Sequence, residues 1–193
     1  MKRIHAAFFL GMLASSCGTQ PAAVATSAPT DAPAPAAFTP QPHATLAQMM
    51  RGIPFTFANI VFDAQSEDPG TPRAATEVRG ATQTFKNVYG GWQEVENSAL
   101  ALAEASNLMM IPGRLCENGK PVPIEDETYR KAAQGLAEAG RAAYKAAQSK
   151  SLDAMVDVSE TVSIACSNCH EPYRDFDDQK DRCTARVRER SSE

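Results

Sequence analysis

The chain has 193 residues, 43% of them hydrophobic, and a formal net charge of -4 at pH 7. Its length suits one domain or two small ones. Lysine and arginine together number 19 and aspartate and glutamate 23, so a nucleic-acid partner is not expected. Beyond the N-terminal segment there is no run of about 20 apolar residues, so no membrane-spanning helix is expected there.

Residues 1–16 have the pattern of a secretory signal. Lys2 and Arg3 precede an apolar stretch over residues 6–14, and small residues then lead to Cys17. The apolar stretch is too short for a stable membrane anchor. The string LASSC resembles a bacterial lipoprotein processing site, which implies a lipidated Cys17, a membrane attachment and a periplasmic location. Ordinary signal-peptidase cleavage, which would leave this cysteine free or remove it, is the alternative.

Residues 17–43 are rich in proline, alanine, threonine and serine and carry a single charge, Asp31. Such a segment cannot bury a core, so it is expected to form an extended linker. After a lipidated cysteine, this linker would hold a folded domain away from the membrane surface. Residues 44–193 are then expected to form one compact domain.

Apolar residues recur at spacings of three and four in the domain, which predicts helices. Four are expected, at about residues 44–64, 91–110, 124–149 and 152–177. Pro54 should kink the first helix and Pro172 bend the last, and an irregular stretch separates the first two. No convincing strand alternation is present. The short remaining connections predict an all-α, antiparallel up-down-up-down four-helix bundle.

The apolar stripe of the last helix is expected to face the core. It consists of Leu152, Met155, Val158, Val162 and Ala165.

The last helix carries the string Cys166-Ser-Asn-Cys169-His170. Two cysteines three residues apart share one face of a helix, where both can form thioethers to one porphyrin while the adjacent histidine coordinates the iron. A redox disulfide would need a βαβ context, and a zinc site would need a second ligand pair; neither is present in the sequence. The string therefore predicts one covalently attached haem c.

The motif and its position resemble the class II cytochromes c, the cytochrome c′ group of four-helix bundles. In that family the motif is followed by acidic residues, an aromatic and a basic residue; here it continues with Glu-Pro-Tyr and Arg174. The resemblance covers roughly residues 44–174. It implies that Cys166 and Cys169 attach the haem, that His170 is the proximal iron ligand, and that Arg174 lies at the haem edge near a propionate.

In this family the sixth iron ligand decides the function. Some members leave the iron five-coordinate and bind small gases, and the low-spin branch uses a methionine of the first helix. Met50 falls where that branch carries its methionine. In the expected topology Met49, Met109 and Met110 also lie at the haem end, and these three, or no methionine ligand, remain open. Met155 lies about 15 Å from the attachment site along the helix axis, which is too far for it to be a ligand.

A haem with methionine and histidine ligands has a raised potential and suits electron transfer. The sequence therefore favours a membrane-tethered periplasmic cytochrome that exchanges single electrons with a redox partner protein and is not an enzyme. A five-coordinate haem protein that binds a small gas such as nitric oxide is the alternative. A thiol oxidoreductase using Cys166 and Cys169 is a third interpretation, and a homodimer is left open.

Basic residues near the C-terminus are candidates for docking an acidic redox partner, with a solvated tail as the alternative. They are Lys180, Arg182, Arg186, Arg188 and Arg190.

Two cysteines remain without a role, Cys116 and Cys183. The first lies in the loop between the second and third expected helices and the second just past the last helix. In the bundle topology both lie at the haem end, and disulfides persist in secreted proteins. A Cys116–Cys183 bridge is therefore predicted, with two independent free thiols as the alternative.

Overall fold

The computed structural model describes residues 38–71 and 88–185. The chain divides into two units, Met1–Phe38 and Thr39–Glu193, and the helices below belong to the second. The signal, the lipidation site Cys17 and most of the linker lie outside the described residues. Within them, no helix is long and apolar enough to cross a membrane.

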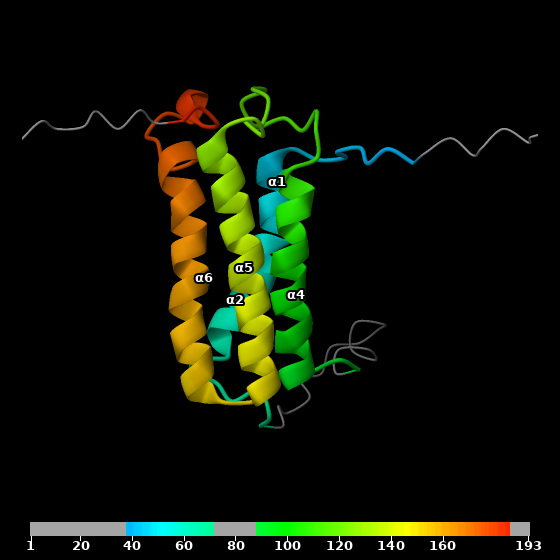
Figure 1. Cartoon of the computed structure of the whole chain (residues 1–193), viewed down its shortest axis with the longest axis vertical. Coiled ribbons are helices and arrows are strands. Elements are labelled where there is room, and N and C mark those ends of the chain that lie inside the picture. Colours follow the sequence, from blue (N-terminus) through cyan, green and yellow to red (C-terminus); the bar gives the residue numbers. More distant parts are fainter. Residues whose placement is uncertain (1–37, 72–87, 186–193) are drawn as a thin grey trace, which may run out of the picture. The chain divides into compact units, whose positions relative to one another are not determined.

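The described part of the chain is helical, as the sequence predicts, and its one β feature is an isolated bridge between Leu115 and Pro121. The helices are α1 (Leu46–Gly52), α2 (Pro54–Asp63), α4 (Trp92–Met109), α5 (Glu127–Ser149) and α6 (Leu152–Tyr173), followed by the 3-10 helix η1 (Gln179–Asp181). Figure 1 shows α4, α5 and α6 side by side, and α2 also contacts both α4 and α6.

The first expected helix is two helices, α1 and α2. Proline at the first position of α2 has no N–H to donate, and the joint falls at Ile53, with φ -120° and ψ -75°. At the other end of α1, Thr45 forms a capping box. Its hydroxyl accepts from the backbone N–H of Gln48, and the Gln48 side-chain oxygen accepts from the backbone N–H of Thr45.

The last helix is shorter than expected. It begins after the Ser151 cap and ends at Tyr173, with Pro172 in its final turn, whereas the sequence suggested an end near residue 177. The chain then turns back, and the Cys183 N–H donates to the Tyr173 carbonyl over 2.8 Å. This return contact pairs the Tyr173 carbonyl outside the helix, at the residue where α6 ends.

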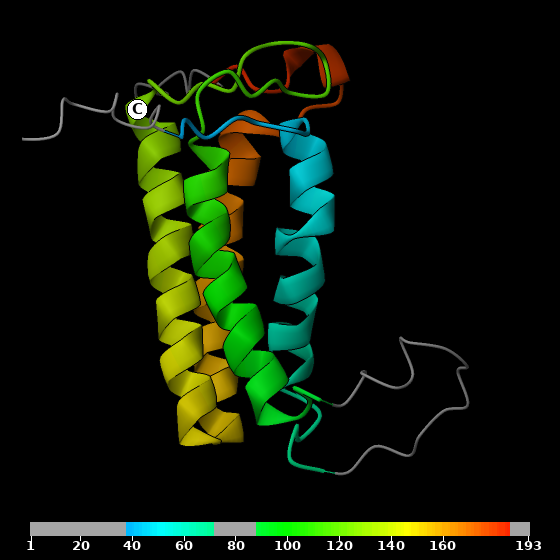
Figure 2. The same cartoon turned by 90° about the vertical axis from the view of Figure 1, so that its right-hand side faces the viewer.

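Several segments meet at one end of the molecule, the upper end in Figure 1. The Leu46 N–H, at the start of α1, donates to the Leu115 carbonyl in the loop after α4 over 2.8 Å. The buried Arg114 guanidinium reaches the carbonyls of Leu108 and Ala44 over distances of 2.7–3.2 Å. The start of α1 is thereby fastened to the end of α4, which Figure 2 shows from the side.

The core consists of two clusters of buried side chains. The first runs along α2, α4, α5 and α6 and includes Leu102, Met155 and Val162; the second lies where the segments meet and includes Met109 and Tyr129. Four of the five residues expected on the α6 stripe are buried. The fifth, Leu152, is 40% exposed, because it lies on the same outward side as Val156, which is 50% exposed.

Helices α4 and α5 approach closely at Gly140. A β-carbon at this position would lie 2.6 Å from the Ala103 backbone nitrogen and 2.8 Å from the Ala99 carbonyl oxygen. Neither backbone atom can move without shifting α4, so the helix spacing depends on the absence of a side chain there.

We expect Gly140→Ala to lower the free energy of unfolding by about 1–3 kcal/mol, because the overpacking outweighs the helix propensity that alanine adds. Gly135→Ala is the matched control in the same helix, since its β-carbon would have no neighbour within 4 Å; it should raise that free energy by up to about 1 kcal/mol. Urea unfolding followed by circular dichroism measures both. Equal effects of the two substitutions would contradict this account of the close approach.

Candidate cofactor site

A cavity of about 440 Å³ lies between helices α1 and α2 on one side and α6 on the other. Its lining extends to the Cys116 and Cys183 side chains. Cys166, Cys169 and His170 line it from α6. Its volume falls in the usual range of small-molecule and cofactor sites, about 300–1,000 Å³. The structure thus brings all three residues of the motif to one cavity.

The side chains on the α1–α2 wall are mostly apolar. The apolar ones are Leu46, Ala47, Met50, Pro54, Phe55, Ala58 and Phe62, and the polar ones are Arg51 and Asn59. An apolar wall facing a small set of convergent polar groups is typical of a site for a largely apolar molecule. Phe55 is 67% exposed, so this wall continues to the protein surface.

The helix geometry of α6 gives the motif its orientation. Residues three and four apart lie on one side of a helix, so Cys166, Cys169 and His170 face the same cavity, and all three are half-buried. Both cysteines have free thiols. Among the described residues, no group of three or more histidine, cysteine, aspartate or glutamate side chains is arranged to hold a metal ion.

Burial keeps the motif uncharged. It raises the pKa of the Cys166 thiol, and it raises the pKa of Cys169 to about 12, with the neighbouring Cys166 adding to the shift. Burial, followed by the positive charge of Arg174, lowers the pKa of His170. At neutral pH the histidine is therefore in the neutral form that binds metals. The thiols, by contrast, lack the lowered pKa of reactive cysteines.

The methionine candidates separate in the structure. All four methionines of this end belong to the second hydrophobic cluster, but only Met50 and Met109 line the cavity, whereas Met49 and Met110 do not. Met155 is fully buried in the other cluster. Met50 comes from α1, the wall that faces the motif, and Met109 from the end of α4.

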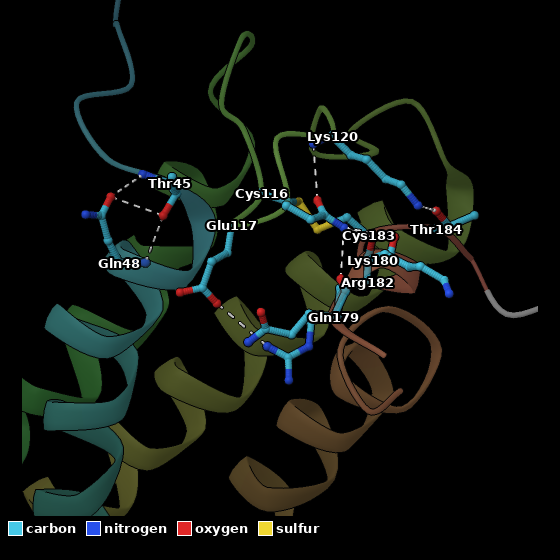
Figure 3. The surroundings of a disulfide bond; sticks show 11 residues. Thr45, Gln48, Cys116, Glu117, Lys120, Gln179, Lys180, Arg182, Cys183 and Thr184 are labelled. Carbon is cyan, nitrogen blue, oxygen red and sulfur yellow. Dashed lines mark hydrogen bonds and ion pairs between the residues drawn. A yellow bond between two sulfur atoms is a disulfide. The ribbon is translucent and has the colours of Figure 1, made fainter. Parts of the chain in front are cut away.

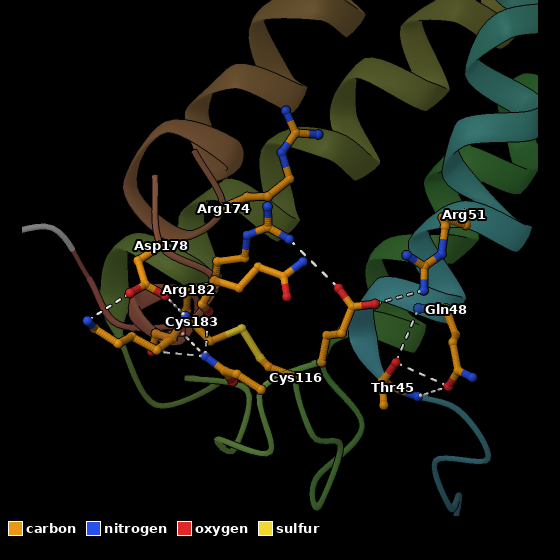
Figure 4. Close-up of polar contacts among 12 residues, drawn as sticks. Thr45, Gln48, Arg51, Cys116, Arg174, Asp178, Arg182 and Cys183 are labelled. Carbon is orange, nitrogen blue, oxygen red and sulfur yellow. Dashed lines mark hydrogen bonds and ion pairs between the residues drawn. A yellow bond between two sulfur atoms is a disulfide. The ribbon is translucent and has the colours of Figure 1, made fainter. Parts of the chain in front are cut away.

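Cationic side chains gather at the end of the cavity that lies next to Cys116 and Cys183. Arg51, Arg174 and Arg182 all line it, together with Glu117. Glu117 makes ion pairs with Arg51 over 3.2 Å and with Arg182 over 3.7 Å, so it links α1 to the segment after α6 (Figure 4). With three arginines against one carboxylate in the lining, this end suits an anionic group.

Arg174, which the family resemblance places at the haem edge, lies beside His170. Its Nη1 is 3.5 Å from His170 Nε2, and its Nε donates to the Asp175 carboxylate over 2.7 Å. The residue expected to approach the cofactor therefore does line the cavity, although its guanidinium now contacts the candidate iron ligand.

Cys116 and Cys183, the pair predicted from the sequence, form a disulfide in the structure with Cα atoms 6.5 Å apart (Figure 3). The loop and the C-terminal segment that they join have further contacts. The Asn118 amide nitrogen lies 3.0–3.1 Å from the carbonyls of Gln179, Lys180 and Arg182. Together these segments, residues 114–122 and 174–185, form what we call the cap.

Two of the five basic residues proposed to dock a redox partner, Lys180 and Arg182, lie within the described residues. Lys180 forms an ion pair with Asp178 over 2.7 Å, and Arg182 faces Glu117. Arg186, Arg188 and Arg190 lie outside the described residues. Both described cations of the tail therefore face acidic side chains of the same chain, Lys180 within hydrogen-bond distance and Arg182 farther away.

Some site residues were missed by the sequence analysis, among them Arg51, Glu117, Asn118 and Tyr129. Tyr129 lines the cavity and is fully buried, with no hydrogen-bond partner for its hydroxyl. Only the Asn-Gly dipeptide at 118 carries a local signal, because it marks a tight turn. The other three become visible only when segments distant in sequence are brought together.

Comparison with known proteins identifies no relative: no protein-family model, curated protein or solved structure matches this chain.

We expect the Cys116→Ser/Cys183→Ser variant to lose about 4 kcal/mol of unfolding free energy, because the disulfide closes a loop across a separation of 67 residues. Chemical denaturation of the variant and the parent measures the difference. Mass spectrometry of a non-reduced digest checks the disulfide itself. We expect it to find one pair of peptides joined through these two cysteines. Recovery of both as separately alkylated peptides would show that the disulfide is absent.

Proposed function

We propose that this chain is a c-type cytochrome that holds one covalently attached haem and transfers single electrons. The observation that carries the proposal is the placement of Cys166, Cys169 and His170 on one wall of a cavity whose opposite wall presents Met50. Attachment needs both thiols and the imidazole to face the same molecule. The shared cavity supports this requirement, and the free state of both thiols is compatible with it.

For the fold we infer an antiparallel up-down-up-down four-helix bundle, with α1 and α2 together as its first helix. The inference is supported by the short connection from α5 to α6, where only Lys150 and Ser151 intervene, and by the meeting of the α1 start with the α4 end. In such a bundle the end of the last helix lies next to the start of the first. That arrangement accounts for a site built from α6 and α1.

The residues of the cavity fit a haem in three respects. The α1–α2 wall offers an apolar surface to a macrocycle, the neutral His170 offers a nitrogen ligand, and the arginines at the capped end offer partners for carboxylates. When bound, haem supplies an iron centre that changes by one electron. Cys166 and Cys169 would hold it covalently on the α6 side.

Met50 is our proposed sixth ligand. A thioether opposite a histidine raises the reduction potential, which suits electron transfer. Met50 lies in the last turn of α1, just before the joint at Ile53 where the chain passes into α2. Met109 is the other methionine that lines the cavity, and it is the alternative within this proposal.

The cellular setting completes the proposal. A secretion signal followed by a lipidated Cys17 would place the protein at a membrane facing the bacterial periplasm. The linker would hold the folded domain away from that membrane, and a redox partner protein would exchange electrons with it there. A five-coordinate haem protein that binds nitric oxide or a similar small gas is the competing function, and the state of the sixth coordination position distinguishes the two.

We expect the chain produced with haem-maturation machinery to retain haem in denaturing gels, and the Cys166→Ala/Cys169→Ala variant to lose it. Haem-stained gels and the mass of the intact protein measure the covalent bond. The Cys116→Ser/Cys183→Ser variant serves as a control for the loss of two cysteines and should keep its haem. A colourless parent protein from such cells would refute the proposal.

We expect the ferric protein to be low-spin with a weak far-red sulfur-to-iron band, and Met50→Ala to abolish the band and yield a high-spin spectrum. Met109→Ala is the matched control and should leave the band in place. If Met109→Ala removes the band instead, the ligand comes from α4. A parent protein that is high-spin and binds nitric oxide or carbon monoxide would favour the gas-binding function.

A further inference from the structure

Arg182, on the cap, has a guanidinium that the protein leaves partly unsatisfied. Its Nε atom is buried and has no hydrogen-bond partner, although the side chain as a whole is 34% exposed and lines the cavity. Its Nη1 faces Glu117 at 3.7 Å, which is an ion pair but longer than a hydrogen bond. A buried donor without an acceptor is costly, so its retention needs an explanation.

The backbone around Arg182 is fixed on both sides. Asn118 Nδ2 lies 3.0 Å from the Arg182 carbonyl, and the Cys183 N–H donates to the Tyr173 carbonyl over 2.8 Å. Cys183 itself is tied to Cys116 by the disulfide. The side chain of Arg182 therefore leaves the backbone at a fixed point beside the cavity, so little conformational freedom is lost when it binds a ligand.

The other two arginines at this end are already engaged. Arg51 donates to Glu117 over 3.2 Å, and the Nε of Arg174 donates to Asp175 over 2.7 Å. A guanidinium recognises a carboxylate best through two parallel N–H groups, and Nε–H with a neighbouring Nη–H is one such pair. Arg182 is the one whose Nε remains to be satisfied.

We propose that Arg182 binds a carboxylate of the molecule that occupies the cavity, and that the Cys116–Cys183 disulfide positions it for this contact. The inference rests on the proposed function: on a haem, the carboxylate is a propionate. It also assigns the disulfide a role in cofactor binding in addition to its effect on stability.

The test uses the holoprotein with Arg182→Gln and Arg182→Lys, and with Lys180→Gln as the matched control. Lys180 lies on the same segment, is paired with Asp178 and does not line the cavity. We expect Arg182→Gln to lower the midpoint potential and to shift the propionate bending bands in the resonance Raman spectrum. The potential falls because a positive charge and its neutralisation of the carboxylate are both lost, which favours the oxidised iron. Lys180→Gln should shift neither observable by a comparable amount.

The lysine variant separates contact from charge. It keeps the positive charge but loses Nε–H and the planar fork, so it should restore most of the potential while leaving the Raman bands shifted. In a Glu117→Gln background the effect of Arg182→Gln should persist, whereas a role confined to pairing with Glu117 predicts that it vanishes.

The role of the disulfide is tested by a double-mutant cycle. We expect Cys116→Ser/Cys183→Ser to lower the potential, and Arg182→Gln to add little in that background, because both changes remove the same contact. Full additivity would overturn the positioning role. Attached haem together with Raman bands unchanged in Arg182→Gln would overturn the carboxylate contact alone. A parent protein without covalent haem would overturn the proposed function and this inference with it.

Discussion

The site depends on the fastening of α1 to the end of α4 by Arg114. Its buried guanidinium binds the carbonyl of Leu108, in the last turn of α4, and that of Ala44, just before α1. A cation at a helix C-terminus is favoured by the helix dipole, and here the same cation also holds a second segment. Because α1 carries Met50 and Arg51, this contact helps to hold the wall opposite the Cys-x-x-Cys-His motif, together with the Leu46–Leu115 hydrogen bond.

The cavity is polarised along its length, and this arrangement explains the protonation of its groups. Between α2 and α6 the lining is apolar or uncharged, so burial keeps the Cys169 thiol protonated and, together with the positive charge of Arg174, lowers the pKa of His170 and keeps it neutral. At the capped end, charged groups concentrate around Glu117. A molecule with an apolar body and acidic groups at one edge matches this gradient in one orientation only, which would place those groups against the cap.

The sequence was sufficient for the parts of the structure that depend on local pattern. Helical spacing predicted the helices, Pro54 predicted the break in the first, and the three-residue spacing of the motif predicted that its members share a face. The early end of α6 at Tyr173 and the site roles of Glu117 and Arg182 were not predictable in this way. The first depends on the return of Cys183 to Tyr173. The other two depend on contact between the segment after α6 and the loop after α4, which are separated by more than 60 residues.

The cysteines also create a pairing problem during maturation. Four of them, Cys116, Cys166, Cys169 and Cys183, line the same cavity, and four thiols allow three complete sets of disulfides. Two of these sets would join both motif thiols, Cys166 and Cys169, to the cap, and would make them unavailable for the proposed haem attachment. Once Cys116 is joined to Cys183, each motif thiol has only the other as a partner among these four cysteines. A reductant then has to keep only the Cys166–Cys169 bond reduced. The cap thus restricts which oxidation errors the folded chain is able to make.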